Sequence, residues 1–352
     1  MDIREATPED NRELQELQAQ CPMGTNLIVS QVNTPDFFAR ANAYQSCRVY
    51  VACEDERIVG SASCAVREAV VGGKIGRVGY EFQYFTSPQY RRSGVAHQLH
   101  RHIEDQLTQD GAVLSYLAIM EDNLPSMRLF EREGFNLHRT LTMPCLLVFK
   151  EMDVPSGGTI RPATEEDLGA IAELLNETWK GFELYEPTSA DLLARFVART
   201  PAYSLDSLLI LEERGEMLAC LGFWDWSRVM RMTVKALSSK MRMMGLLLDV
   251  ARLLRPMPHS PKPGRTLRQI MLTPIGFKDP GDLAALLRHL NNLALERGIE
   301  QVFCVCEPGH AMLTSTKGFV RMDTAIRLYV KPLRENVSIG DGPVFVDGVD
   351  LS

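Results

Sequence analysis

At 352 residues, the chain is long enough for two domains that each bury a core. Its 45% hydrophobic and 24% charged residues are ordinary for a globular protein, and the net charge of −7 argues against nucleic-acid binding. The sequence contains no apolar run long enough to span a membrane and no signal-peptide pattern, which predicts a cytoplasmic protein. The eight cysteines are scattered, mostly in apolar runs, so we expect reduced core thiols and no metal site.

The chain opens on a short strand and a helix start. Within residues 3–10, Thr7 is typical of a helix N-cap and Pro8 of the first helical position. Residues 49–66 then predict a β-hairpin, and residues 78–86 predict a further strand. This alternation of strands and helices indicates an α/β fold.

The stretch from Phe85 to Ala96 ends that strand and begins a helix. Pro88 breaks the strand, and a short basic turn follows. Apolar residues then recur with helical spacing from Ala96 to Leu107. The N–H groups of a first helical turn lack intrahelical acceptors and carry partial positive charge, so the turn predicts a cradle for a diphosphate. The cradle residues are Arg91, Arg92, Ser93, Gly94, Val95 and Ala96.

A second motif follows about thirty residues later, after a predicted strand at 113–119. Residues 121–135 contain Asn123, Ser126 and Phe130 and end in Gly-Phe. With the Arg-x-x-Gly-x-Ala cradle, this pattern resembles the acyl-CoA binding motifs of the GNAT acetyltransferase superfamily. The resemblance implies two tandem GNAT-like domains, each a mixed, mostly antiparallel sheet flanked by helices. It also implies acetyl-CoA as cofactor.

The resemblance also assigns roles to individual residues. The backbone of Phe85 and Thr86 would pair with pantetheine, and Asn123 would contact the cofactor, although it also suits a helix N-cap. Phe130 stands where many members carry a tyrosine that protonates the leaving thiolate. Phenylalanine cannot donate a proton, so Ser126 or a water is the candidate for that step.

Glu81 is the candidate general base, because it is the only carboxylate on the strand before the cradle. A solvent-facing edge residue is the alternative, since the sequence does not fix which way this strand faces. Tyr80, Tyr84 and Tyr116 are candidates for the acceptor pocket, with a place in the core as the alternative. Surface positions are the expectation for the histidines of the cradle helix.

The opening of the chain recurs in its second half. Ile160 to Asp167 matches Ile3 to Asp10 at six of eight positions, which indicates a duplicated domain. We therefore predict an N-terminal domain at 1–152, a linker at 153–158, a C-terminal domain at 159–334 and a tail at 335–352.

The second copy departs from the motif where chemistry is expected. Lys278 to Leu283 aligns with Arg91 to Ala96, but Asp279 and Asp282 bring negative charge and Pro280 lacks an N–H. The C-terminal domain is therefore expected to be catalytically silent.

About thirty extra residues fall within 228–268, where ten lysines and arginines meet a single acid. Apolar residues from Met232 to Leu254 roughly follow helical spacing, and prolines from Pro256 onwards stop the pattern. We expect an amphipathic helix that covers or supports the second domain, with an anionic membrane surface as the alternative.

The sequence thus predicts a transferase that moves acetyl from acetyl-CoA to a primary amine of a small molecule or peptide. The alternatives are a non-catalytic acyl-CoA-binding regulator and an interaction or membrane-surface module. A homodimer is compatible with the sequence, and the acceptor is not identified, because pocket loops vary freely on one fold.

Overall fold

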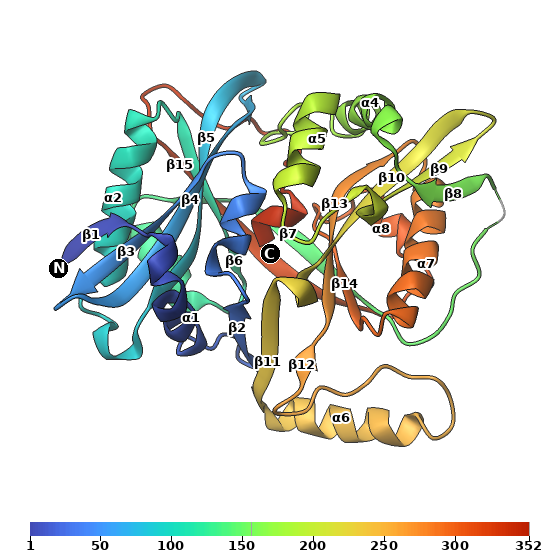
Figure 1. The fold of residues 1–352 in the computed structure, drawn as a ribbon, viewed down its shortest axis with the longest axis horizontal. Coiled ribbons are helices and arrows are strands. Elements are labelled where there is room, and N and C mark those ends of the chain that lie inside the picture. The colour runs from blue at the N-terminus through green and yellow to red at the C-terminus, as the bar shows by residue number, and fades with distance from the viewer. Residues whose placement is uncertain (156, 352) are drawn as a thin grey trace.

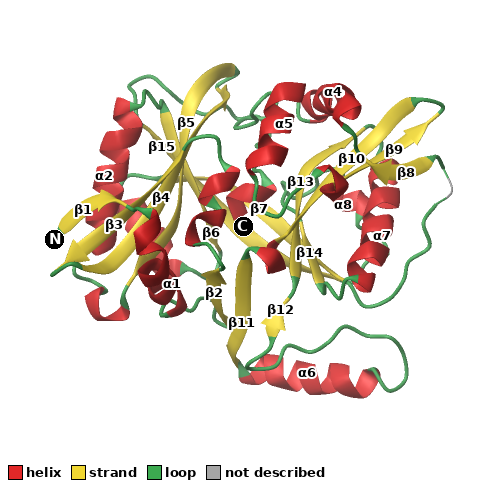
Figure 2. Cartoon of the chain, viewed as in Figure 1, coloured by secondary structure: helices red, strands yellow, loops and turns green. Residues whose placement is uncertain are grey.

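The computed structural model describes residues 1–155 and 157–351 (Figures 1 and 2). The predicted linker at 153–158 and tail at 335–352 each include one residue, 156 and 352, outside that range. The first half contains β1 (Asp2–Glu5), α1 (Asn11–Ala19), β2 (Leu27–Asn33), β3 (Cys47–Glu54), β4 (Arg57–Val71), β5 (Lys74–Thr86), α2 (Val95–Gln109), β6 (Leu114–Met120), α3 (Leu124–Arg132) and β7 (Asn136–Leu147). The second half contains β8 (Thr159–Pro162), α4 (Leu168–Thr178), α5 (Ala190–Arg199), β9 (Leu208–Glu213), β10 (Glu216–Asp225), β11 (Met230–Leu237), α6 (Ser239–Ala251), β12 (Thr266–Leu267), β13 (Gln269–Phe277), α7 (Pro280–Glu296), β14 (Gln301–Phe303), α8 (Met312–Ser315) and β15 (Arg321–Pro332).

One 12-stranded sheet crosses the molecule in the order β1-β3-β4-β5-β6-β15-β7-β14-β13-β10-β9-β8 (Figure 2). Counted from each edge towards the centre, the strands of the two halves correspond: the order is β1-β3-β4-β5-β6-β15 from one edge and β8-β9-β10-β13-β14-β7 from the other. In each half one central pair is parallel, β5 with β6 and β13 with β14, and the other pairs are antiparallel. The predicted α/β class with a mixed, mostly antiparallel sheet flanked by helices is confirmed, and the sheets of the two halves join into one.

The halves exchange their closing strands at the centre of the sheet. β15, the last strand of the chain, pairs with β6 of the first half, and β7 pairs with β14 of the second. β7 and β15 also pair with each other from Arg321–Leu146 to Val330–Asn136. The predicted domain boundary near residue 152 stays a prediction, because the sheet is continuous across it.

The hydrophobic core follows this exchange. The largest central cluster combines Tyr80 and Tyr116 of the first half with Trp224 and Met271 of the second. Val344, Val346 and Val349 of the C-terminal segment are buried in or beside this cluster. The described part of the predicted tail is therefore a core element, and its end lies between the halves at the label C in Figure 1.

A buried ion pair anchors that segment. The Asp350 side chain is fully buried and lies 2.9 Å from the guanidinium of Arg67 on β4. The hydroxyls of Tyr116 (2.9 Å) and Tyr44 (3.1 Å) donate to the same carboxylate, and Arg40 donates to the Asp350 carbonyl at 2.6 Å. A buried charge with this many partners is strongly tied to the fold, because the loss of one partner leaves the other charge uncompensated.

The basic insertion differs from the expected single helix. Residues 230–237 form strand β11, which pairs with β2 of the first half and with β12. The helix, α6, covers only Ser239–Ala251 and lies apart from the main body at the bottom of Figure 1. The expectation of a helix from Met232 is wrong because Met230, Met232 and Val234 alternate inwards with strand periodicity. In this position α6 does not cover the second half as a lid.

We predict that Asp350→Asn lowers the free energy of unfolding by about 3–5 kcal/mol, since Arg67 stays buried without a counter-charge. Urea denaturation of the variant checks this value. The double variant Arg67→Met/Asp350→Asn should lose less than the sum of the two single losses, because the pair is coupled. Additive losses would contradict the importance of the ion pair.

Candidate active site

The site begins where β5 and β6 separate. The two strands pair only from Val78–Leu114 to Tyr80–Tyr116, although β5 continues to Thr86 and β6 to Met120. A bulge lies in this part of β5, where Gln83 adopts a φ of 54° and the register with β4 shifts. The facing backbone edges of residues 81–86 and 117–120 therefore do not bond to each other. Such edges can pair with an extended ligand that carries amides.

The predicted cradle lies at the end of β5. Gly94, with a φ of 88°, is the N-cap of α2, and Arg92 two residues earlier has a φ of 66°. Among the residues that the structure describes, no side chain forms a capping hydrogen bond at this helix N-terminus. The Arg91 and Arg92 side chains are exposed and form no ion pair with a carboxylate of the described chain. Free N–H groups, the helix dipole and two cations together suit a diphosphate.

The space in front of Gly94 is open. A Cβ placed on this residue would meet only the Gln98 side chain, 4.0 Å away, within the described chain. Ser93 turns its hydroxyl back to the Tyr90 carbonyl at 2.6 Å, and so holds the turn. The residues present therefore fit the phosphate group that the sequence predicts.

Glu81 lies directly beyond the last paired residue of β5, on the face covered by α2. It is 2% exposed, so the solvent-facing alternative is wrong. Ser115 donates to one carboxylate oxygen at 2.7 Å, and the Tyr84 hydroxyl donates to the other. His100 Nδ1 lies 2.9 Å from that second oxygen. Glu81 is thus a hydrogen-bonded carboxylate at the vertex of the gap between the strands.

His100 is the member of this cluster that the sequence analysis missed. It is fully buried, contrary to the expected surface position. Burial lowers the pKa of its imidazole, but the hydrogen bond and charge of Glu81 outweigh burial and raise the pKa above the ordinary value. Its position was readable, because Ala96, His100 and Ile103 follow the spacing of the buried helix face.

The second motif forms α3, which starts beside the same gap. The Asn123 side chain is its N-cap and accepts from the Ser126 N–H at 3.3 Å, while Ser126 itself is half-buried. Phe130 is 4% exposed and packs edge-on against Tyr84, with 5.0 Å between ring centroids. Burial and the Glu81 charge raise the pKa of Tyr84, which therefore keeps its proton. Phe85 is buried against the α1 side of the sheet, and Thr86 lies at the end of β5.

The other two candidate tyrosines are core residues on the opposite face of the sheet. Tyr80 and Tyr116 are 2% and 0% exposed, with ring centroids 4.9 Å apart. Both hydroxyls bond to Asp350, Tyr80 to its carbonyl and Tyr116 to its carboxylate.

The equivalent helix start in the second half is already capped. Asp279 is the N-cap of α7 and accepts from the Gly281 N–H at 2.7 Å. The Asp279 carboxylate thus occupies the position at the start of α7 that a bound anion would take. Structurally, Asp279 corresponds to Gly94 as N-cap, so α7 begins two residues earlier than the sequence alignment of Gly281 with Gly94 implied.

The edge of β13 is also occupied. Trp179 Nε1 donates to the Ile275 carbonyl at 2.7 Å. Gly348 of the C-terminal segment lies so close that a Cβ on it would be 2.3 Å from the Leu272 carbonyl oxygen. Segments of the chain itself therefore fill the gap in the second half.

A cavity of about 110 Å³ lies between the halves. Its apolar wall includes side chains of α4, α5 and β13, and its polar wall comprises Gln45, Arg67, Glu186, Arg199 and Asp347. The half-buried Glu186 carboxylate forms no hydrogen bond or ion pair with the described chain. Burial raises its pKa and that of Asp347. Sequence analysis gave no signal for this cavity, because its walls come from distant segments.

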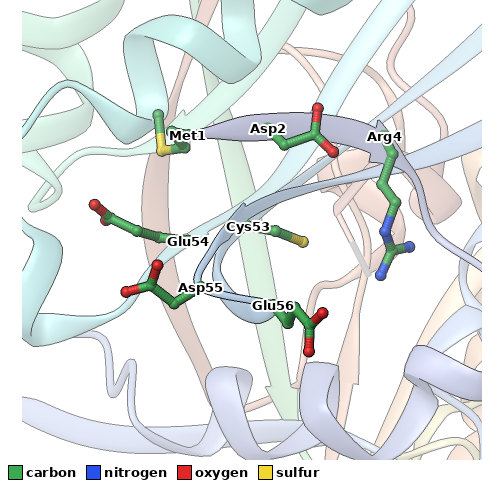
Figure 3. A pocket seen from close by; sticks show the side chains of 7 residues that line it. All are labelled: Met1, Asp2, Arg4, Cys53, Glu54, Asp55 and Glu56. Atoms are coloured by element: carbon green, nitrogen blue, oxygen red, sulfur yellow. The ribbon is translucent and has the colours of Figure 1, made fainter.

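A second hollow, shown in Figure 3, lies at the outer edge of the sheet. Asp2, Glu54, Asp55 and Glu56 surround it, and its cation, Arg4, is paired with Asp10 at 2.7 Å. The negative charge of these four carboxylates repels a polyanionic cofactor. Within residues 1–155 and 157–351, no cluster of histidine, cysteine or acidic side chains is suited to a metal ion. No helix in these ranges is long and apolar enough to cross a membrane.

Comparisons with known proteins agree with the fold. Residues 11–135 match the model of the acetyltransferase (GNAT) family. A Saccharomyces cerevisiae N-myristoyltransferase with bound myristoyl-CoA superimposes with a TM-score of 0.66 at 12% identity, over 98% of this chain and 89% of that one. A probable N-acyltransferase of unknown function from Enterococcus faecalis V583 gives a TM-score of 0.51 at 11% identity, over 94% and 72%. No curated protein matches the sequence. The part of the chain that carries the cradle is therefore similar in sequence to the acetyltransferase (GNAT) family, and the whole chain shares its fold with these acyltransferases.

Proposed function

We propose that the protein is an N-acyltransferase that transfers acetyl from acetyl-CoA to a primary amine of a small molecule or peptide. The observation that carries the proposal is the uncapped start of α2 beside the gap between β5 and β6. Arg91 to Ala96 would hold the diphosphate, and the edge at Phe85 and Thr86 would hold pantetheine. The thioester supplies an acyl carbon that is open to attack by a neutral amine.

Glu81 is the proposed proton acceptor. As the amine nitrogen bonds to the acyl carbon and the carbon–sulfur bond breaks, the ammonium proton would pass to Glu81 directly or through water. The buried position of Glu81 under α2 favours a relay, in which Ser115 and Tyr84 hold its carboxylate. The thiolate would take a proton from Ser126 or solvent, because Phe130 has none to give. A thiol has an ordinary pKa near 8.5, so the thiolate can leave without a protein group that protonates it.

The second half is proposed to be catalytically silent. Asp279 and Asp282 repel a polyanion, and Asp279 satisfies the N–H that the anion would use. A structure with acetyl-CoA density at Gly281 rather than Gly94 would overturn this assignment.

A non-catalytic acyl-CoA-binding regulator is the second candidate, favoured by the phenylalanine at position 130. A thiol-release assay with acetyl-CoA and longer acyl-CoAs against a panel of amines, aminoglycosides and peptide N-termini separates the two. Turnover with any acceptor supports the enzyme, whereas tight binding without thiol release supports the regulator.

We predict that Arg91→Glu raises the Kd for acetyl-CoA at least about tenfold, since each charge pair near a surface contributes on the order of 1–4 kcal/mol. Gly94→Glu should do the same, because its side chain enters the cradle. Calorimetry on folded protein measures both. Gly281→Glu is the matched control at the start of α7, and it should leave affinity unchanged; equal losses would contradict a single cradle.

Glu81→Gln should lower kcat at neutral pH by roughly 10²–10⁴-fold, the usual contribution of a positioned base. The loss should shrink at high pH, where free amine is abundant. Phe130→Tyr should leave the rate similar or raise it. A pH–rate profile of each variant gives the result, and a loss for Glu81→Gln that is constant with pH would remove the base assignment.

NMR titration of His100 supplies an independent control for the Glu81→Gln variant. Without the Glu81 charge, the His100 pKa should fall, since burial alone lowers it. A raised pKa in the folded state stabilises the protein below the ordinary histidine value of about 6.5. The stabilisation from protonated His100 is lost as the pH rises through its raised pKa. The difference in free energy of unfolding between the wild type and Glu81→Gln should therefore narrow over that pH range.

The amine is proposed to bind in the cavity between the halves. The Glu186 carboxylate lines this cavity without a hydrogen bond to the described chain, although Arg67 and Arg199 lie in the same wall, and the apolar wall suits a non-polar substituent on the amine. Arg67 links this cavity to the active half, because its guanidinium lies 5.4 Å from the Tyr116 ring at the vertex of the strand gap.

Accordingly, Glu186→Gln should raise KM for the amine roughly tenfold, since a hydrogen bond to a charged group contributes about 1.5–3 kcal/mol. The Kd for acetyl-CoA should not change. Glu177→Gln, at an exposed carboxylate of α4, is the matched control. An unchanged amine KM in Glu186→Gln would place the acceptor elsewhere.

A further inference from the structure

Helix α6 stands on a small sheet of its own. β11 pairs with β2 from Met230–Asn33 to Leu237–Leu27, and the chain returns through β12, which pairs with β11 at Thr233 and Met232. This sheet joins the insertion firmly to the first half. In Figure 1 the helix lies across the end of this small sheet, apart from the 12-stranded sheet and the helices that flank it.

One side of the helix is packed against the loop that follows it. Gly245 is buried, and a Cβ on it would lie 3.3 Å from the Ser260 side chain. Ser260 donates to Asp249 at 2.9 Å, and Lys262 forms an ion pair with Asp249 at 3.0 Å. The return loop therefore fixes which side of α6 faces outwards.

The outward side is an apolar stripe. Its members follow helical spacing and are strongly exposed, including Leu246 at 68%, Leu247 at 66%, Leu253 at 84% and Leu254 at 88%. The full stripe is Met243, Leu246, Leu247 and Val250 on α6, with Leu253 and Leu254 in the turn that follows Ala251. Isolated exposed leucines are ordinary, but six neighbouring apolar side chains on one projecting helix and the turn at its end mark an interaction surface.

Cations border the stripe. Lys240, Arg242, Arg252 and Arg255 are exposed, and the single acid of residues 228–268 is already paired with Lys262. With ten lysines and arginines, the insertion has a net charge of +9, so the remainder of the chain is near −16. The charge of the molecule is therefore strongly polarised towards α6.

We propose that α6 is a membrane-surface anchor that docks the protein onto anionic phospholipid. The apolar stripe enters the boundary between headgroups and acyl chains, and the bordering cations contact lipid phosphates. The acidic remainder of the chain is repelled by such a surface, so only the α6 end faces it. Docking orients the protein without any segment that crosses the bilayer.

Charge complementarity favours lipid over a second copy of the chain. A symmetric contact between two α6 helices would bring two +9 insertions together, and like charges across an interface weaken association. An anionic headgroup layer supplies the opposite charge along the whole helix.

Sedimentation of the full chain with vesicles tests the anchor. Wild type should pellet with vesicles of phosphatidylcholine and phosphatidylserine at low salt and should be released at high salt. Vesicles of pure phosphatidylcholine should bind at least tenfold less. Leu253→Glu/Leu254→Glu should weaken binding to the anionic vesicles at least tenfold, as should Lys240→Glu/Arg252→Glu.

Ile75→Glu is the matched control, because Ile75 is 55% exposed on the distant β4–β5 hairpin. Thermal unfolding checks that every variant is folded. Three results would overturn the proposal: equal binding to both vesicle types, no binding by wild type, or full binding by the leucine variant.

Analytical ultracentrifugation is a second test. A wild-type dimer that the leucine variant abolishes would also overturn the proposal, since that result assigns the stripe to a second copy of the chain. Acyl transfer plays no part in this readout.

Discussion

The pairing of β7 with β15 is the constraint on which the rest of the structure depends. Each strand completes the sheet of the other half, so β6 has a second partner, beside β5, only because the chain returns after residue 320. The same exchange brings the C-terminal segment between the halves, where Asp350 meets Arg67 and Tyr116. The ordered position of Tyr116 at the vertex of the strand gap therefore depends on residues more than two hundred positions away. Neither half is a self-sufficient unit in this arrangement.

The two halves share one strand order, and small differences separate the starts of α2 and α7. In the first half, Gly94 leaves the start of α2 bare and the strand gap open. In the second, Asp279 caps α7, while Trp179 and the segment at Gly348 occupy the edge of β13. The substitutions in the second copy stabilise the same backbone with internal contacts where the first copy leaves groups for a ligand.

Local patterns predicted much of this, because they depend on neighbours in sequence. The strand, turn and helix at 78–107, the repeated opening at Ile160 and the departure at Asp279 were all readable. Glu81 was identified as the carboxylate of its strand, but its burial required knowledge of which face α2 covers. The strand exchange, the Asp350–Arg67 pair and the cavity at Glu186 join distant segments, for which a single sequence has no periodic signal. The helix at Met232 was misassigned since a short methionine-rich run fits both periods until its partner β2 is known.

The bare start of α2 has a consequence for the lifetime of the protein. A helix without a cap lacks the hydrogen bonds and charge balance that Asp279 gives to α7, so a bound anion would supply them. A ligand that binds only the folded chain stabilises it in proportion to the logarithm of its concentration. If the cradle holds acyl-CoA as proposed, the free energy of unfolding rises with the concentration of acyl-CoA in the cell. When that concentration falls, a larger fraction of the protein is unfolded and open to proteolysis.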